Sequence, residues 1–124
     1  MTSPEIVDQP TFARFLDSLG GDVDFLAELV EAYMDSSPEL FGSMRQAIAT
    51  GEAPALQRAA HSLKNGSASF GALTFAAACK ELEDLGKTGA LPQAEEKLGT
   101  LEEAYVEVVM SLQEQVRRAR SAPA

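Results

Sequence analysis

Apolar residues recur at helical spacings of three and four along almost the whole chain, and no other feature restricts the fold as strongly. Two runs show the pattern most clearly: Phe25, Leu26, Leu29, Val30, Tyr33 and Met34; and Leu98, Leu101, Tyr105, Val108, Leu112 and Val116. No segment alternates apolar and polar residues as a half-buried strand does. The sequence therefore predicts an all-α protein.

Turn and capping signals divide this pattern into one short helix and four long ones. Asp8 is placed to cap a first helix over 9–19, which Gly20 and Gly21 end. The long helices are expected over 22–50, with a kink or short break at 36–39 around Pro38, over 54–70, over 72–85 before Gly86, and from about 91 onward. Short connections make successive helices antiparallel, so we expect an up-down four-helix bundle with a short additional N-terminal helix.

The chain has enough residues for one domain. It contains 124 residues, of which 45% are hydrophobic, and this suits a single modest core. We expect one helical domain over 8–120. Residues 1–7 and 121–124 offer little to pack and are expected to be flexible.

Charge and composition exclude several classes of partner. The net charge of −9 disfavours nucleic acid and anionic membranes. There is no long apolar run and no basic-then-apolar leader, so we expect a cytoplasmic protein. The single cysteine, Cys79, has no partner in the chain for a disulfide and is expected to pack in the core.

The only histidine, His61, is expected on the solvent side of its helix. Five residues form the stripe that should face the core: Leu56, Ala60, Leu63, Ser67 and Phe70. At roughly 100° per residue, His61 points about 140° away from that stripe. Lys64, Asn65 and Ala68 share its face, so the approach to the ring is lined by one cation and small residues.

Acidic residues are absent from the segment that contains the histidine. No Asp or Glu occurs from residue 53 to residue 80, whereas Arg58, Lys64 and Lys80 are basic. An alternative explanation is that two buried, alanine-rich helices have no room for carboxylates. In either case, an anionic group on His61 would meet little repulsion from its own helix.

The residues around His61 resemble the motif of histidine-containing phosphotransfer (HPt) domains, which reads approximately A-H-x-L-K-G-x-x-x-x-x-G-A. The matching residues are Ala60, His61, Leu63, Lys64, Gly71 and Ala72, and the sequence departs from the motif at Asn65, where glycine is usual. The resemblance extends over nearly the whole chain. It implies a bundle that presents one phosphorylatable histidine.

The resemblance also implies a chemistry and a set of partners. His61 would accept a phosphoryl group from a receiver-domain aspartate and pass it to another aspartate, and Lys64 would neutralise charge on the phosphoryl oxygens. The partners would be receiver domains of response regulators and a hybrid histidine kinase. Mg²⁺ would be held by the receiver, and we expect this chain to bind no cofactor or metal itself.

Four further site residues follow from position. Arg58, Asn65 and Ala68 are expected to form the face on which a receiver docks. Because the chain turns back near Gly71, Glu83 should lie level with His61, where its carboxylate would hydrogen-bond and orient the ring.

Other functions have weaker support in the sequence. One histidine and one cysteine make no metal cluster, and no nucleophile lies within a hydrolase motif. There is no kinase ATP-binding motif, so the chain is expected to be a phosphoryl carrier and not a kinase. The main alternative is a helical adaptor that inhibits a histidine kinase without being phosphorylated. Because the chain begins with Met and shows no further domain, we expect a standalone shuttle. We also expect it to be a monomer.

Overall fold

The structure, a computed structural model, describes residues 5–122. Within that range there are five helices and no strands, which confirms the expected all-α class. None of the described helices combines the length and hydropathy that a membrane span requires. The helices are α1 (Gln9–Ser18), α2 (Val23–Thr50), α3 (Ala53–Ser69), α4 (Leu73–Thr88) and α5 (Leu91–Ser121).

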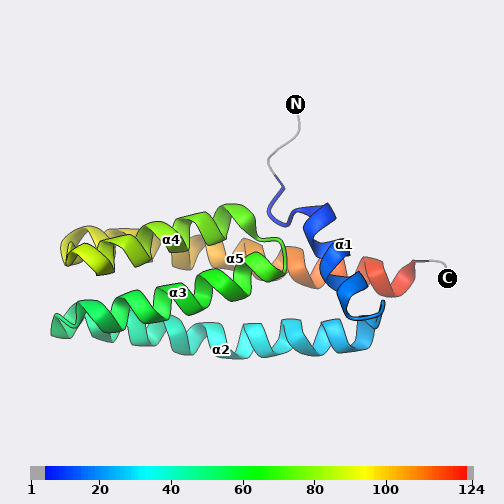
Figure 1. The fold of residues 1–124 in the computed structure, drawn as a ribbon, viewed down its shortest axis with the longest axis horizontal. Helices are drawn as coiled ribbons and strands as arrows, with labels where there is room; N and C mark the ends of the chain where they lie inside the picture. The colour runs from blue at the N-terminus through cyan, green and yellow to red at the C-terminus, as the bar shows by residue number, and fades with distance from the viewer. Residues whose placement is uncertain (1–4, 123–124) are drawn as a thin grey trace.

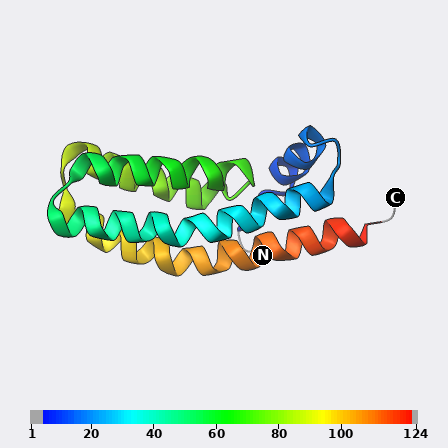
Figure 2. The same cartoon turned by 90° about the horizontal axis from the view of Figure 1, so that it is seen from below.

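Helices α2 to α5 form the expected antiparallel bundle (Figure 1). They close a ring in which α3 packs against α2 and α4, and α5 also packs against α2 and α4. Helices α2 and α5 are much longer than the other two, and their far halves extend beyond the α3–α4 pair (Figure 2). Helix α1 lies near that end and contacts α3.

Side-chain caps and one glycine fix the ends of the helices. Asp8 and Asp22 begin α1 and α2 by accepting hydrogen bonds from the backbone N–H groups three residues on, as the sequence predicts. Gly71 makes the turn between α3 and α4 with a φ of 93°, and its carbonyl accepts a 2.8 Å hydrogen bond from the backbone N–H of Asp8. A Cβ at Gly71 would lie 2.8 Å from the Asp8 carbonyl oxygen, so only glycine fits this turn.

Two helices continue where the sequence suggested interruptions. Helix α2 is one continuous helix through Pro38, so the expected short break is absent, although the axis changes direction near its middle (Figure 2). Packing of α2 against both α3 and α5 maintains the helix despite the missing N–H of Pro38. Helix α4 runs past Gly86 to Thr88, and Gly89 ends it in the left-handed conformation.

Gly86 allows α3 and α4 to approach each other closely. A Cβ at this position would lie 3.0 Å from the backbone nitrogen of Gln57 and 3.3 Å from the carbonyl oxygen of Ala53. Both of those atoms belong to the backbone of α3, which cannot move aside as a side chain would. The expectation that Gly86 follows the end of its helix is therefore wrong, because the glycine sets the separation of two helices.

The expected boundaries of the packed region also change. Val7 is buried in the core, with 3% of its surface exposed, so the expectation that all of residues 1–7 lack packing partners is wrong. At the other end, Ser121 is the last residue of α5. Of the residues expected to be flexible, 1–4 and 123–124 lie outside the described part of the chain.

The core contains the predicted residues of the histidine helix. All five members of the expected stripe are buried: Leu56, Ala60, Leu63, Ser67 and Phe70. Ser67 is satisfied there, because its hydroxyl donates to the Leu63 carbonyl at 2.7 Å and hydrogen-bonds the Tyr33 hydroxyl at 2.7 Å. Cys79 is also fully buried, as expected, and this burial raises the pKa of its thiol to about 12.

Candidate functional site

His61 lies on the side of α3 that faces away from the core. Its side chain is 51% exposed, while its neighbours Ala60 and Leu63 are buried. The orientation follows from helix geometry, since the buried stripe fixes how α3 is rotated about its axis. The predicted solvent-facing position of the ring is therefore confirmed.

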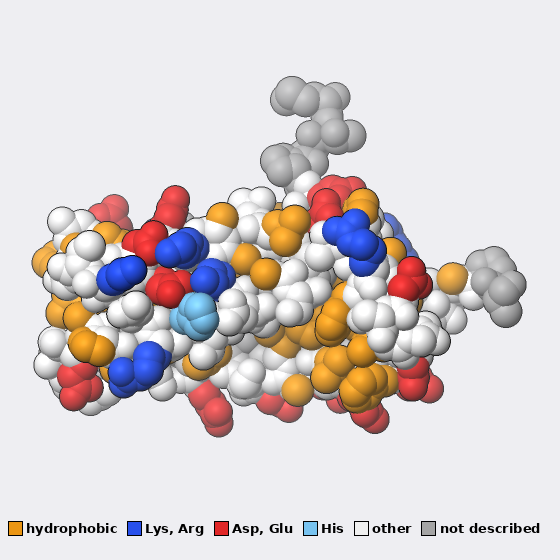
Figure 3. Space-filling view, in the orientation of Figure 1, with side chains coloured by type: hydrophobic (Ala, Val, Ile, Leu, Met, Phe, Trp, Pro, Cys, Tyr) orange, Lys and Arg blue, Asp and Glu red, His pale blue; other side chains and the backbone are white. Residues whose placement is uncertain are grey.

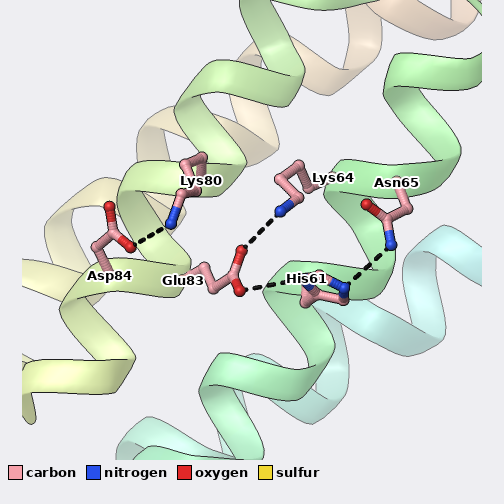
Figure 4. A network of polar contacts seen from close by, with 6 residues as sticks. All are labelled: His61, Lys64, Asn65, Lys80, Glu83 and Asp84. Carbon is pink, nitrogen blue, oxygen red and sulfur yellow. Dashed lines mark hydrogen bonds and ion pairs between the residues drawn. The ribbon is translucent and has the colours of Figure 1, made fainter.

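Helix α4 supplies a carboxylate to this ring. Glu83 Oε2 lies 3.0 Å from His61 Nδ1, and its side chain is only 12% exposed (Figure 4). The turn at Gly71 reverses the chain, and Gly86, one turn after Glu83, brings the two helices close enough for the contact. The structure thus places Glu83 where the sequence predicted it.

Lys64 bonds to the same carboxylate. Its Nζ donates to Glu83 Oε1 at 3.1 Å, so Glu83 bridges the lysine and the histidine. Burial opposes ionisation of Glu83, but the hydrogen bonds from Lys64 and His61 outweigh it and hold the pKa of Glu83 below its usual value. The carboxylate is therefore ionised at neutral pH, and it compensates the charge of Lys64.

Asn65 contacts the other nitrogen of the ring. Its Nδ2 lies 3.1 Å from His61 Nε2 (Figure 4). Because a carboxylate only accepts hydrogen bonds, the Nδ1 that faces Glu83 carries the proton of the neutral imidazole. Nε2 then keeps its lone pair and accepts a hydrogen bond from Asn65. The sequence placed Asn65 on this face but did not predict that it touches the ring.

The other two members of the expected docking face are more peripheral. Arg58 is exposed and lines a shallow hollow together with His61 and Glu83. Ala68 is half-buried, two helical turns beyond His61. The described residues thus bring His61, Lys64, Asn65 and Glu83 into one connected network and leave these two at its edges.

The surroundings of His61 carry charges of both signs. Figure 3 shows acidic as well as basic side chains beside the histidine. The acid-free segment of the sequence is therefore not an acid-free surface, because α4 contributes Glu83 and also Asp84, which pairs with Lys80 at 2.7 Å. Among residues 5–122, no group of three or more His, Cys, Asp or Glu side chains is arranged to hold a metal ion.

Comparison with known proteins identifies the class to which this bundle and histidine belong. Residues 28–122 match the model of the Hpt domain, and the chain therefore belongs to the Hpt domain family. This makes it a phosphotransfer protein of two-component signalling.

A solved structure resembles the chain over nearly its whole length. It is the crystal structure of histidine-containing phosphotransfer protein B from Pseudomonas aeruginosa PAO1, with 28% sequence identity and a TM-score of 0.83. The match covers 94% of this chain and 98% of that chain. No curated protein matches the chain significantly.

Proposed function

We propose that His61 accepts a phosphoryl group on Nε2 from the aspartyl phosphate of a receiver domain and later passes it to the aspartate of another response regulator. The observation that carries this proposal is the pairing of Nδ1 with Glu83 on a ring that is half exposed. That contact holds the proton on Nδ1 and leaves the Nε2 lone pair as the nucleophile.

Each neighbour has a part in this step. When Nε2 attacks phosphorus, the ring becomes cationic, and the ionised Glu83 stabilises that charge through the Nδ1 proton. Lys64 keeps Glu83 ionised and in place, and its ammonium adds positive potential near the incoming phosphoryl group. Arg58 and Ala68 belong to the face on which the receiver docks.

Phosphoryl transfer requires alignment and charge neutralisation more than covalent machinery. We therefore expect the receiver to supply both the aspartate and Mg²⁺, and this chain to supply the positioned nucleophile. It would then act as a carrier, receiving its phosphoryl group from a hybrid histidine kinase by way of a receiver domain. We expect it to act as a monomer in the cytoplasm.

The test is transfer from a phosphorylated receiver in the presence of Mg²⁺. The protein should gain one phosphoryl group that is labile in acid and persists in alkali, which identifies phosphohistidine. His61→Gln should remain folded and bind the receiver, because the side chain supports no core packing, yet carry no label.

The adaptor alternative gives a different result. An inhibitor that works by binding alone would associate with a kinase or receiver, would never be labelled, and would keep its activity in cells with His61→Gln. That set of results would refute phosphotransfer.

A further inference from the structure

The side chain that hydrogen-bonds the reacting nitrogen in this structure belongs to Asn65, four residues beyond His61 on the exposed face of α3. We propose that Asn65 is a catalytic residue whose amide holds the Nε2 lone pair at rest and donates to a phosphoryl oxygen once phosphorus is bound there. This inference rests on the proposed function and assigns Asn65 a role in the chemistry as well as in docking.

The geometry separates the task of Asn65 from that of Lys64. Lys64 Nζ is bonded to Glu83, which lies on the Nδ1 side of the ring, so its charge is already shared with a carboxylate. Asn65 Nδ2 lies 3.1 Å from Nε2 on the other side. A donor already placed at the nucleophilic atom is close to where the phosphoryl oxygens will stand.

Asn65 is also free to move without disturbing the fold. Its side chain is exposed, and Asn65 is neither a member of the described core nor packed against it. A rotation of the side chain releases Nε2 for attack. The amide carries two N–H groups, so it can leave the ring nitrogen and meet an oxygen of the arriving group.

The transfer step balances in atoms and electrons. The Nε2 lone pair forms the N–P bond while the P–O bond of the aspartyl phosphate breaks, and that electron pair leaves with the receiver carboxylate. The Nδ1 proton stays between the ring and Glu83. The Asn65 N–H exchanges a neutral acceptor, the imidazole nitrogen, for a charged one, the phosphoryl oxygen.

Hydrogen bonds to charged groups are stronger than neutral ones, so this exchange favours the phosphorylated state. Removing the amide should therefore lower the equilibrium ratio of phosphorylated to unphosphorylated protein by roughly tenfold. A residue that acts only in docking has no such effect. The equilibrium between dissociated partners does not depend on how tightly they bind each other.

The test uses phosphoramidate, a small donor that transfers its phosphoryl group to an imidazole and releases ammonia without any receiver. Phosphoryl occupancy of His61 is measured in a buffer of fixed phosphoramidate and ammonia concentrations for the wild type, Asn65→Ala and Asn65→Asp. Ser69→Ala is the matched control, because it removes a polar side chain whose hydrogen bond goes to the backbone carbonyl of Asn65 and leaves the Asn65 amide in place.

We expect the occupancy ratio to fall roughly tenfold in Asn65→Ala and further in Asn65→Asp, whose carboxylate repels the phosphoryl group, and to stay unchanged in Ser69→Ala. Equal ratios in the wild type and Asn65→Ala would overturn the proposal, as would failure of phosphoramidate to label the wild type. The ¹⁵N signals of the single imidazole give a second check. Nε2 should be unprotonated, and its signal should move in Asn65→Ala; a proton on Nε2 would also overturn the proposal.

These outcomes are independent of the test with a receiver. A protein that shows the Asn65 effect with phosphoramidate but is never labelled by a receiver would refute the proposed function and leave the chemistry of Asn65 standing. A protein labelled by receivers with no Asn65 effect would refute only the inference about Asn65.

Discussion

Gly86→Ala tests whether the close approach of α3 and α4 holds the site together. The added Cβ would lie 3.0 Å from the backbone nitrogen of Gln57, whereas ordinary contacts of carbon atoms lie at about 3.5–4.0 Å. Because Gln57 presents backbone here, α4 must move away from α3 by roughly half an ångström. Glu83 lies one turn before the substitution and moves with it.

Two opposing effects decide the change in stability. Replacing glycine by alanine inside a helix stabilises the folded state by roughly 0.5–1 kcal/mol. Overpacking a well-filled contact costs about 1–3 kcal/mol. We expect Gly86→Ala to lower the free energy of unfolding by about 1 kcal/mol.

The chain offers two matched controls. Gly42 in α2 and Gly99 in α5 are exposed helical glycines, and a Cβ at either would meet nothing within 4 Å. Gly42→Ala and Gly99→Ala should therefore show the stabilising effect alone. The difference between them and Gly86→Ala, about 2 kcal/mol in urea unfolding, measures the packing cost.

The site provides a second measurement. His61 is the only histidine, so its Nδ1 signal in ¹⁵N spectra reports the contact with Glu83 directly. That signal should move in Gly86→Ala and stay in place in both controls. If Gly86→Ala were as stable as the controls and left the Nδ1 signal unchanged, Gly86 would not set the geometry of the site.

Three other predictions concern pH, docking and the buried thiol. Because the folded protein lowers the pKa of Glu83, the stability advantage of the wild type over Glu83→Gln should be complete above the usual glutamate pKa of 4.5 and should disappear as the pH falls through the lower pKa of the folded protein. A constant difference in urea unfolding from pH 7 to pH 3 would contradict this. Ala68→Trp should slow transfer from a receiver roughly tenfold while phosphoramidate labelling stays normal. Ala32→Trp, at an exposed position on α2, is the control. If Ala68→Trp slowed both reactions equally, the defect would lie outside docking. Burial raises the pKa of the Cys79 thiol to about 12, so this thiol should react very slowly with a thiol reagent at pH 8 until the protein is unfolded. Rapid reaction of the native protein would show that the core opens easily.

The fold class and the orientation of His61 could be predicted because they depend on periodicity alone. A buried stripe at helical spacing determines how α3 is rotated, and this places His61 on the opposite side. The position of Glu83 followed from counting residues on either side of the turn at Gly71. Both inferences need only local geometry.

The features that the sequence did not reveal depend on contacts between helices. A glycine can end a helix or allow another helix to approach, and only the position of Gln57 in space shows which applies at Gly86. Pro38 stays within α2 because neighbouring helices hold it there. The contact of Asn65 with His61 is the exception, since residues at i and i+4 are neighbours on a helix and this spacing alone would have indicated it.

The network of the site is contained in one helical hairpin, and this has a consequence for how the protein folds. His61 and Glu83 are separated by 22 residues, whereas Arg45 and Glu102, which join α2 to α5, are separated by 57. Closing the shorter loop costs less entropy, by about 0.8 kcal/mol from loop length alone. The α3–α4 hairpin should therefore form before α2 and α5 meet, so substitutions such as Gly86→Ala should slow folding, whereas changes at the α2–α5 contact should mainly speed unfolding.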